Sequence, residues 1–394
     1  MASKRSRSGR PKTPGRRQGH PARRTGSRDD TLSDDAAEGF ARRLRTLVAT
    51  ARDPLEAALM ASQFCEPWCP PSPALANDLE RDIGLPVVGH VARIAGDESL
   101  AALRALEHAG TDRLRASAGA AADRLADTGA AEPDWLEAAR ATALADTAIV
   151  HTDAFDDAHT LLFEFAAPDR EPHTLGVHVD RMHGSIAQNL LAGPALLRLS
   201  ETLVGRAGEA GYGRLRLTTV DPVDATVRAL SAMHRTATAV DPPIGDALPA
   251  LWSLARTRLR ALPGADRAPV DVGTVSGDAR RELARAFAAT VPYGTGAEPT
   301  PETIARAVID VAVDTAGGDP LRISPAVVRR YREHTAQDDA AVDDEERRRR
   351  RDALRSWAAF AGARSGLATG AVAQTLAAVD APLEGDPDES ATPG

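Results

Sequence analysis

The sequences HTLLFEF (159–165) and HTLGVHVD (173–180) decide the fold, because they carry the clearest strand pattern in a chain otherwise rich in helical patterns. Apolar residues alternate with a period of two in both, so that Leu161 and Phe163 share one face of the first strand. The residues between them, AAPDREP (166–172), are typical of a turn. The pattern predicts a β-hairpin.

The hairpin also determines which titratable residues of this segment can lie close together. Residues 151–184 contain five of the ten histidines of the chain and seven acidic residues. Pairing the two strands along their apolar faces places Phe165 opposite His173 and His159 opposite Val179. His159 and His173 are then separated by roughly 20 Å, because a strand rises ~3.3 Å per residue. These two histidines cannot bind one metal ion.

A β-α-β unit is predicted to follow the hairpin. Residues 184–208 have apolar residues at helical spacing, and Pro194 is expected to break or kink this helix. RLRLTTVD (214–221) is predicted to be a third strand. A strand, a crossover helix and a further strand form a parallel, right-handed unit.

The flanking regions have helical patterns. Asp53-Pro54-Leu55-Glu56 combines an N-cap residue with a proline at the first helical position, and Ser324-Pro325 is a second helix start. The predicted fold class is therefore α+β and mostly helical, with a small central sheet made of the hairpin plus one strand of the β-α-β unit. The predicted regions are a disordered basic tail (1–34), a helical region (35–131), a central α/β domain (132–242), a C-terminal helical region (243–380) and an acidic disordered tail (381–394).

Four residues form a candidate metal site. Asp157 precedes the first strand of the hairpin, and Asp180 and His183 follow the second strand at the same end. A third strand parallel to the second would bring Asp221 to that end, where open α/β sheets bind ligands. Carboxylates with one imidazole suit Mg²⁺ or Mn²⁺, which predicts a metal-assisted hydrolase or phosphotransfer enzyme.

A structural interpretation of the same residues needs no cofactor. Asp221 before Pro222 has the pattern of a helix cap, and Asp180 is placed to cap the segment after Gly184. The sequence contains no glycine-rich phosphate loop with lysine, no nucleophile elbow and no HExxH motif. Both interpretations stay open at this point.

Charge is distributed unevenly along the chain. Residues 1–28 contain eight arginines, two lysines and no acidic residue, whereas the whole chain has a net charge of −8. The remaining 366 residues therefore carry −8 − 10 = −18. A segment this basic, without apolar residues, is expected to be disordered and to make weak, non-specific contact with nucleic acid. The candidate contact residues are Arg5, Arg7, Arg10, Arg16, Arg17, Arg23 and Arg24. The alternative is a solubilising tail that contacts the acidic body of the same chain.

A group of short motifs resembles a set of uncharacterised actinobacterial proteins. The motifs are a DPLE sequence at residues 53–56, a PxW sequence at 133–135, DxFDD at 153–157, HTL at 173–175 and VD at 179–180. The resemblance covers about residues 50–190. It implies a shared α+β fold and no particular activity.

Several protein classes are not expected. No apolar run approaches the ~18 residues of a membrane span, and no apolar segment follows the basic segment as in a secretory signal. Cys65 and Cys69 are too few for a disulfide framework and are expected to be ordinary cytoplasmic thiols. The sequence therefore favours a non-catalytic intracellular interaction or regulatory protein with an unknown protein partner, and the metal-assisted enzyme is the alternative.

Overall fold

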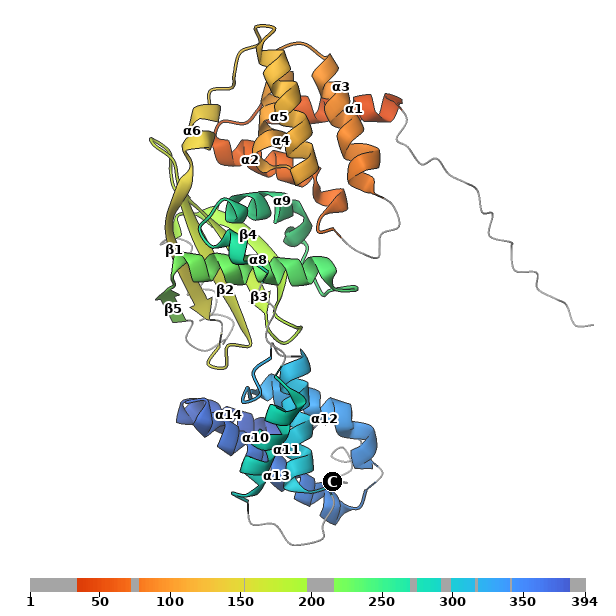
Figure 1. The fold of residues 1–394 in the computed structure, drawn as a ribbon, viewed down its shortest axis with the longest axis vertical. Helices are drawn as coiled ribbons and strands as arrows, with labels where there is room; N and C mark the ends of the chain where they lie inside the picture. Colours follow the sequence, from red (N-terminus) through yellow and green to blue (C-terminus); the bar gives the residue numbers. More distant parts are fainter. Residues whose placement is uncertain are drawn as a thin grey trace, which may run out of the picture. The chain divides into compact units, whose positions relative to one another are not determined.

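The computed structural model describes residues 34–71, 78–151, 153–196, 216–269, 275–291, 299–315, 318–340 and 342–382 (Figure 1). Helices account for most of these residues, and five strands form one sheet. The predicted class, a mostly helical α+β fold with a small sheet, is confirmed. No helix within the described ranges is both long enough and apolar enough to span a membrane.

Helices dominate the first described part of the chain. Asp53 caps α2 as predicted, because its carboxylate accepts a hydrogen bond of 2.9 Å from the backbone N–H of Glu56. Alanine and leucine side chains fill the contacts between these helices. The helices are α1 (Asp34–Val48), α2 (Pro54–Phe64), α3 (Leu85–Arg93), α4 (Asp97–Ala109), α5 (Asp112–Ala126) and α6 (Leu136–Ala141), with short turns of helix at η1 (Glu66–Trp68) and η2 (Glu80–Gly84).

The sheet contains five antiparallel strands in the order β4-β3-β2-β1-β5. The predicted hairpin is formed by β2 and β3, and its register pairs Phe165 with His173 and His159 with Val179. This register is the predicted one, so His159 and His173 do lie far apart along the sheet. The strands are β1 (Ala143–His151), β2 (Ala158–Ala166), β3 (His173–Asp180), β4 (Ile186–Pro194) and β5 (Arg216–Thr219).

The prediction of a helix directly after the hairpin is wrong. Residues Ile186–Pro194 form strand β4, which pairs antiparallel with β3, and the remainder of the predicted helix lies mostly outside the described residues. The turn between these strands uses positive φ angles at Gly184 (82°) and Ser185 (58°). Pairing with β3 overrides the helical spacing of the apolar residues. Pro194 is tolerated because it ends an edge strand, where one side of the backbone needs no partner.

The predicted β-α-β unit is also wrong. Strand β5 pairs with β1, not with the hairpin, and it runs antiparallel to β1. Strand β1 was not predicted, since its sequence ALADTAIVH follows a helix and alternates only weakly. The third predicted strand therefore reaches the sheet from the opposite direction, and its carboxyl end lies away from the carboxyl end of β3.

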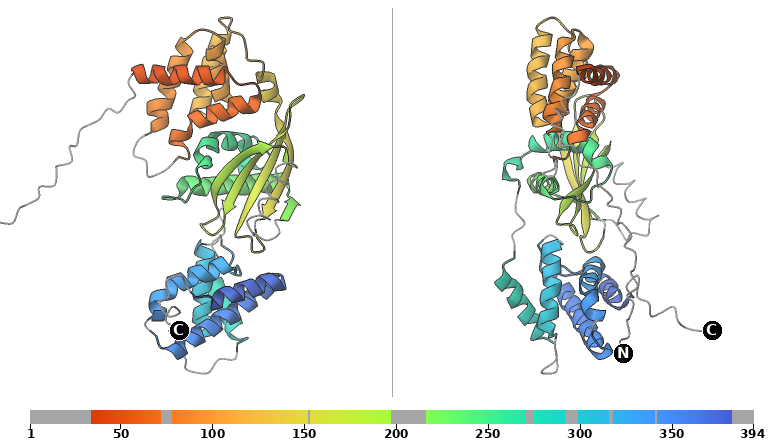
Figure 2. Two further views of the ribbon diagram at one scale, coloured as in Figure 1. Left: turned by 180° about the vertical axis from the view of Figure 1, so that it is seen from behind. Right: turned by 90° about the vertical axis from the view of Figure 1, so that its right-hand side faces the viewer.

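Two helices, α8 (Pro222–Thr238) and α9 (Ala247–Arg260), cover one face of the sheet (Figures 1 and 2). This face carries the alternate residues Leu161, Phe163 and Phe165 of β2, which are buried. Helix α9 also contacts α2 and α4, so that one continuous apolar core extends from α1 to α9. This core crosses the predicted region boundaries at residues 131/132 and 242/243.

Five C-terminal helices enclose a second apolar core around Phe287 and Trp357. The start at Ser324 is as predicted, since its hydroxyl accepts a hydrogen bond of 3.1 Å from the backbone N–H of Val327. Met182, from the turn after β3, belongs to this second core. The helices are α10 (Gly277–Ala288), α11 (Pro301–Thr315), α12 (Pro325–Ala340), α13 (Asp344–Arg364) and α14 (Thr369–Asp380).

Candidate functional site

Three of the four predicted metal ligands lie at one end of the sheet. Ala158 pairs with Asp180, and the backbone N–H of Arg181 donates to the carbonyl of Asp157 at 3.0 Å. Because the hairpin register is the predicted one, Asp157, Asp180 and His183 share the end at which β2 begins and β3 finishes. Their side chains nevertheless have different partners.

Asp221 does not join them. Strand β5 is antiparallel to β1, so the register of the sheet puts Asp221 about six residues along the sheet and three strands across from Asp180. At ~3.3 Å per residue and ~4.8 Å per strand, the separation is roughly 25 Å. The carboxylate of Asp221 caps α8, accepting from the backbone N–H groups of Val223 (3.0 Å) and Asp224 (3.1 Å). The structure therefore gives Asp221 the helix-cap role.

Asp157 forms a buried ion pair. The Nη2 group of Arg322 donates to Asp157 Oδ1 at 2.8 Å and also to the backbone carbonyl of Asp156. Only 3% of the Arg322 side chain and 16% of the Asp157 side chain are exposed. Burial raises the pKa of Asp157, and the hydrogen bond from Arg322 opposes this rise. Asp157 thus joins the β2 start to the segment that precedes α12.

Asp180 and His183 form a hydrogen-bonded pair within the turn after β3. His183 Nδ1 lies 2.6 Å from Asp180 Oδ2, and Asp180 Oδ1 accepts from the backbone N–H of Met182 at 2.8 Å. Among the described residues, the other ring nitrogen of His183 has no hydrogen-bond partner. A carboxylate that fixes one imidazole nitrogen leaves the other available as a base or a ligand.

His183 lines a pocket of about 280 Å³. Its other walls come from the turn after α8, which includes Asp241, and from Asp314 of α11 and Arg330 of α12. Arg330 also donates to the carbonyl of Met182 at 3.3 Å. The pocket therefore combines one imidazole, two carboxylates and a guanidinium, which can bind a polar small molecule through several hydrogen bonds.

Sequence reasoning missed a second network, centred on Asp156. Its Oδ1 atom is 3.1 Å from Nδ1 of both His151 and His159, and Arg181 binds its Oδ2 atom. Nε2 of His159 lies 3.1 Å from the Nη2 group of Arg228 on α8. Since Arg228 donates to Nε2, the proton of neutral His159 is on Nδ1 and points to Asp156.

Electrostatics agree with that assignment. Burial lowers the pKa of His159, and the charges of Arg228 and Arg181 lower it further against the opposing effect of Asp156. Burial alone would raise the pKa of Asp156, but its hydrogen bond with His159 and the charge of Arg181 outweigh this effect and hold it below the ordinary value. Both ring nitrogens of His159 are occupied, so His159 stabilises the strand end and is not a free base.

A local signal for this network existed in the sequence. Asp153 accepts from the backbone N–H groups of Phe155 (2.7 Å) and Asp157 (3.2 Å), and this tight turn holds Asp156 at a φ of 57°. Aspartate is one of the few residues that tolerate this conformation. The partners Arg181 and Arg228 are 25 and 72 residues away, so the sequence pattern did not indicate them.

The predicted nucleic-acid contacts at Arg5, Arg7, Arg10, Arg16, Arg17, Arg23 and Arg24 lie outside the described residues. Helix α1 is the first described element after them. An open depression of about 470 Å³ is lined by Gly39, Arg42, Arg43, Thr46 and Leu47 of this helix and by Thr50, which follows it.

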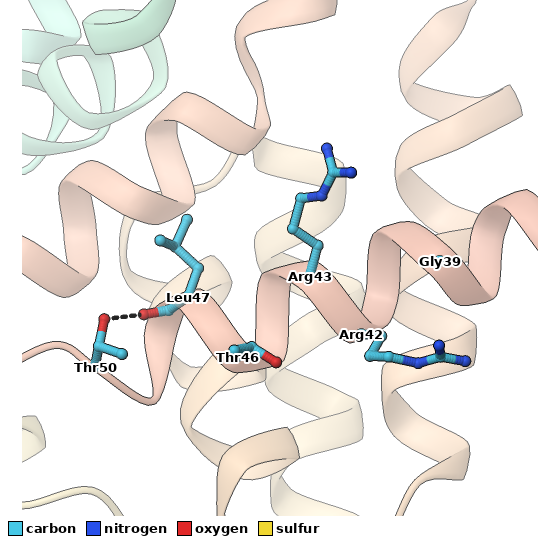
Figure 3. A pocket seen from close by; sticks show the side chains of 6 residues that line it. All are labelled: Gly39, Arg42, Arg43, Thr46, Leu47 and Thr50. Atoms are coloured by element: carbon cyan, nitrogen blue, oxygen red, sulfur yellow. Dashed lines mark hydrogen bonds between the residues drawn. The ribbon is translucent and has the colours of Figure 1, made fainter.

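Figure 3 shows that Arg42 and Arg43 extend from α1 in different directions. Arg42 pairs with Glu38 at 2.8 Å, whereas Arg43 is exposed and has no ion pair with any described residue. Phe40 and Leu47 on this helix are each 42% exposed. The outer surface of α1 thus combines a cation with apolar area.

The two cysteines are free and buried. Burial raises the pKa of the Cys65 thiol to about 12 and also raises that of Cys69. Thiols held in the protonated form are poor nucleophiles and poor metal ligands.

Within the described ranges, no three or more His, Cys, Asp or Glu side chains are grouped closely enough to hold a metal ion. Comparison of the chain with protein-family models, with curated proteins and with solved structures found no match.

Proposed function

We propose that this protein is a non-catalytic interaction protein that contacts nucleic acid through residues 1–28. The observation that carries the proposal is the separation of charge, with +10 in those 28 residues and −18 in the other 366. A polyanion is repelled by the acidic body and attracted by the basic segment, so contact concentrates there. Arginines that neutralise phosphates release counterions, which gives affinity without sequence preference.

The outer surface of α1 supports the second half of the proposal, binding of a protein partner. Phe40 and Leu47 are exposed apolar side chains seven residues apart, and Arg43 lies between them. A cytoplasmic location is part of this proposal, because a reducing compartment keeps thiols such as Cys65 and Cys69 unpaired.

The test of nucleic-acid contact uses charge-matched variants of the full chain. Changing the seven arginines from Arg5 to Arg24 to glutamine is expected to weaken binding to labelled duplex DNA and single-stranded RNA strongly in fluorescence anisotropy, because only Lys4, Lys12 and Arg28 remain as cations in this segment. Changing the same seven to lysine is expected to preserve most of the affinity, because counterion release depends on charge. Each lost phosphate contact should reduce the slope of log K against log salt by about 0.9 on duplex DNA.

Deletion of residues 1–28 provides the decisive comparison. An unchanged affinity and salt slope after deletion would reject the proposal, as would equal affinities of the glutamine and lysine variants.

A metal-assisted hydrolase or phosphotransfer enzyme is the second candidate, and one observation favours it. The Asp180–His183 pair lies beside a pocket that also carries Asp241 and Asp314. Mn²⁺ or Mg²⁺ bound there is expected to raise the melting temperature of the wild type by several degrees. Asp180→Asn should remove that shift, whereas Asp221→Asn should retain it because Asp221 caps α8 elsewhere. No shift with either metal, together with no metal in the purified protein, would eliminate this candidate.

A further inference from the structure

Three arginines of the described chain are buried, and they have different surroundings: Arg104 is 4% exposed, Arg322 is 5% exposed and Arg258 is 7% exposed. Arg104 binds three carboxylates, and Arg322 binds Asp157. Arg258, on the last turn of α9, has no ion pair with any described residue. A buried cation without a counter-charge is unfavourable, because desolvation is not repaid.

The unpartnered atoms of Arg258 define one edge of its guanidinium. Its Nε and Nη2 atoms are buried and have no hydrogen-bond partner within the described part of the chain. Arg104 uses the same two atoms to bind Glu132, with Nε 3.1 Å from both carboxylate oxygens and Nη2 2.6 Å from one. That edge is the one with which arginine binds carboxylates and phosphates through two parallel hydrogen bonds.

Two histidines with buried ring nitrogens accompany Arg258, and each can donate a hydrogen bond. Its guanidinium lies 5.5 Å from the centre of the Phe165 ring, and His173 stacks on the same ring at 5.8 Å. Nε2 of His173 and Nε2 of His108 are also buried without a partner among the described residues. A neutral histidine protonated at that nitrogen is a hydrogen-bond donor.

The charges that contribute most to the pKa shifts of His108 and His173 are positive, with the exception of Asp53. Burial lowers the pKa of His108 to about 4, and the charges of Arg258, Arg115 and Arg140 contribute. Burial lowers the pKa of His173 to about 4 as well, with Arg258 contributing and Asp53 opposing. For Arg258 itself, burial alone lowers the pKa to about 10, and no acidic group among the described residues opposes this shift.

We propose that Arg258, with His108 and His173, forms a binding site for a small oxyanion, namely a carboxylate or phosphate group. The ligand accepts two hydrogen bonds from Nε and Nη2 of Arg258 and supplies the missing negative charge. The site lies where α4, α9 and the β2–β3 hairpin meet, so it does not depend on residues 1–28.

The test is a titration of the full chain with inorganic phosphate and, separately, acetate, each at constant ionic strength in chloride buffer. The melting temperature of the wild type is expected to rise saturably with at least one of the two anions. At about 100 times its Kd, a bound ligand shifts the ratio of folded to unfolded protein about 100-fold. Calorimetric titration gives the stoichiometry, which is expected to be one.

Variants on one helix locate the site. Arg258→Met is expected to remove the response while leaving the protein folded, since it replaces a lone buried charge by an apolar chain of similar length. Arg258→Lys keeps the positive charge but cannot form two parallel hydrogen bonds, so the affinity for the anion should fall at least tenfold. The matched control is Arg260→Met, because Arg260 is exposed and pairs with Asp112 at 2.6 Å. This control should respond as the wild type does.

Two outcomes would overturn the proposal. One is the absence of any saturable response of the wild type to phosphate and acetate, which needs no variant. The other is an undiminished response in Arg258→Met and Arg258→Lys, which would place anion binding elsewhere, for example on the basic segment. If Arg258→Met does not fold, the wild-type titration and Arg258→Lys decide the question.

Discussion

Replacing Arg322 by methionine is expected to lower the free energy of unfolding by about 3–5 kcal/mol. The substitution leaves the carboxylate of Asp157 buried without its counter-charge, and it also removes the hydrogen bond to the carbonyl of Asp156. Burial already raises the pKa of Asp157, so the loss of Arg322 raises it further. Urea denaturation followed by circular dichroism measures the effect.

Two further variants separate the ion pair from general effects of the mutation. The double variant Arg322→Met/Asp157→Asn is expected to recover much of the lost stability, because no buried charge is left. Arg329→Met changes an exposed arginine of α12 and should alter stability by no more than about 0.5 kcal/mol. A loss below about 1 kcal/mol for Arg322→Met, or additive effects in the double variant, would contradict this account.

Acidification is expected to destabilise the protein in the window from pH 6.5 to about pH 4. Burial lowers the pKa of His108 and His173 from 6.5 to about 4 in the folded protein. The unfolded chain therefore takes up protons first as the pH falls, and stability present above pH 6.5 is lost until the folded pKa is reached. One pKa unit corresponds to about 1.4 kcal/mol, so each histidine contributes roughly 3 kcal/mol. Burial also lowers the pKa of His178, which adds to the loss.

The measurement is the urea midpoint at pH 7, 6, 5 and 4. His173→Phe should reduce the loss by about the share of one histidine, since phenylalanine keeps the stacking on Phe165 without a titrating group. His234→Phe, at an exposed position of α8, is the control for the substitution itself and should change the urea midpoint at pH 7 little. A midpoint that is constant from pH 7 to pH 4 would show that these histidines do not titrate as described.

Two of the three buried arginines, Arg322 and Arg258, give the two ends of the sheet different surroundings. At the end where β3 finishes, Arg322 compensates a carboxylate, and the nearby Asp180–His183 pair lines a pocket. At the end where β3 begins, His173 lies in a cluster with the uncompensated charge of Arg258. The antiparallel register separates the end of the sheet with Asp157 and His183 from the end with His173 and Arg258. The histidines of residues 151–184 therefore do not form one group.

Part of the candidate site was predictable from the sequence. Asp157, Asp180 and His183 reach the same end of the sheet because hairpin register follows from the alternation of apolar residues. Asp221 was misplaced because its position depended on the direction of β5, which no local pattern encodes. Arg322 and Arg258 were missed because their neighbours lie many residues away in the sequence.

The sequence by itself determined the features that depend on neighbouring residues. The cap at Asp53, the helix start at Ser324 and the β2–β3 hairpin each arise from hydrogen bonds or side-chain periodicity within a few residues. Only the tertiary structure decided that residues 186–194 form a strand and that β5 pairs with β1. The physical reason is that strand pairing and the burial of charge are stabilised by groups distant in the chain, and such contacts override local helical preference.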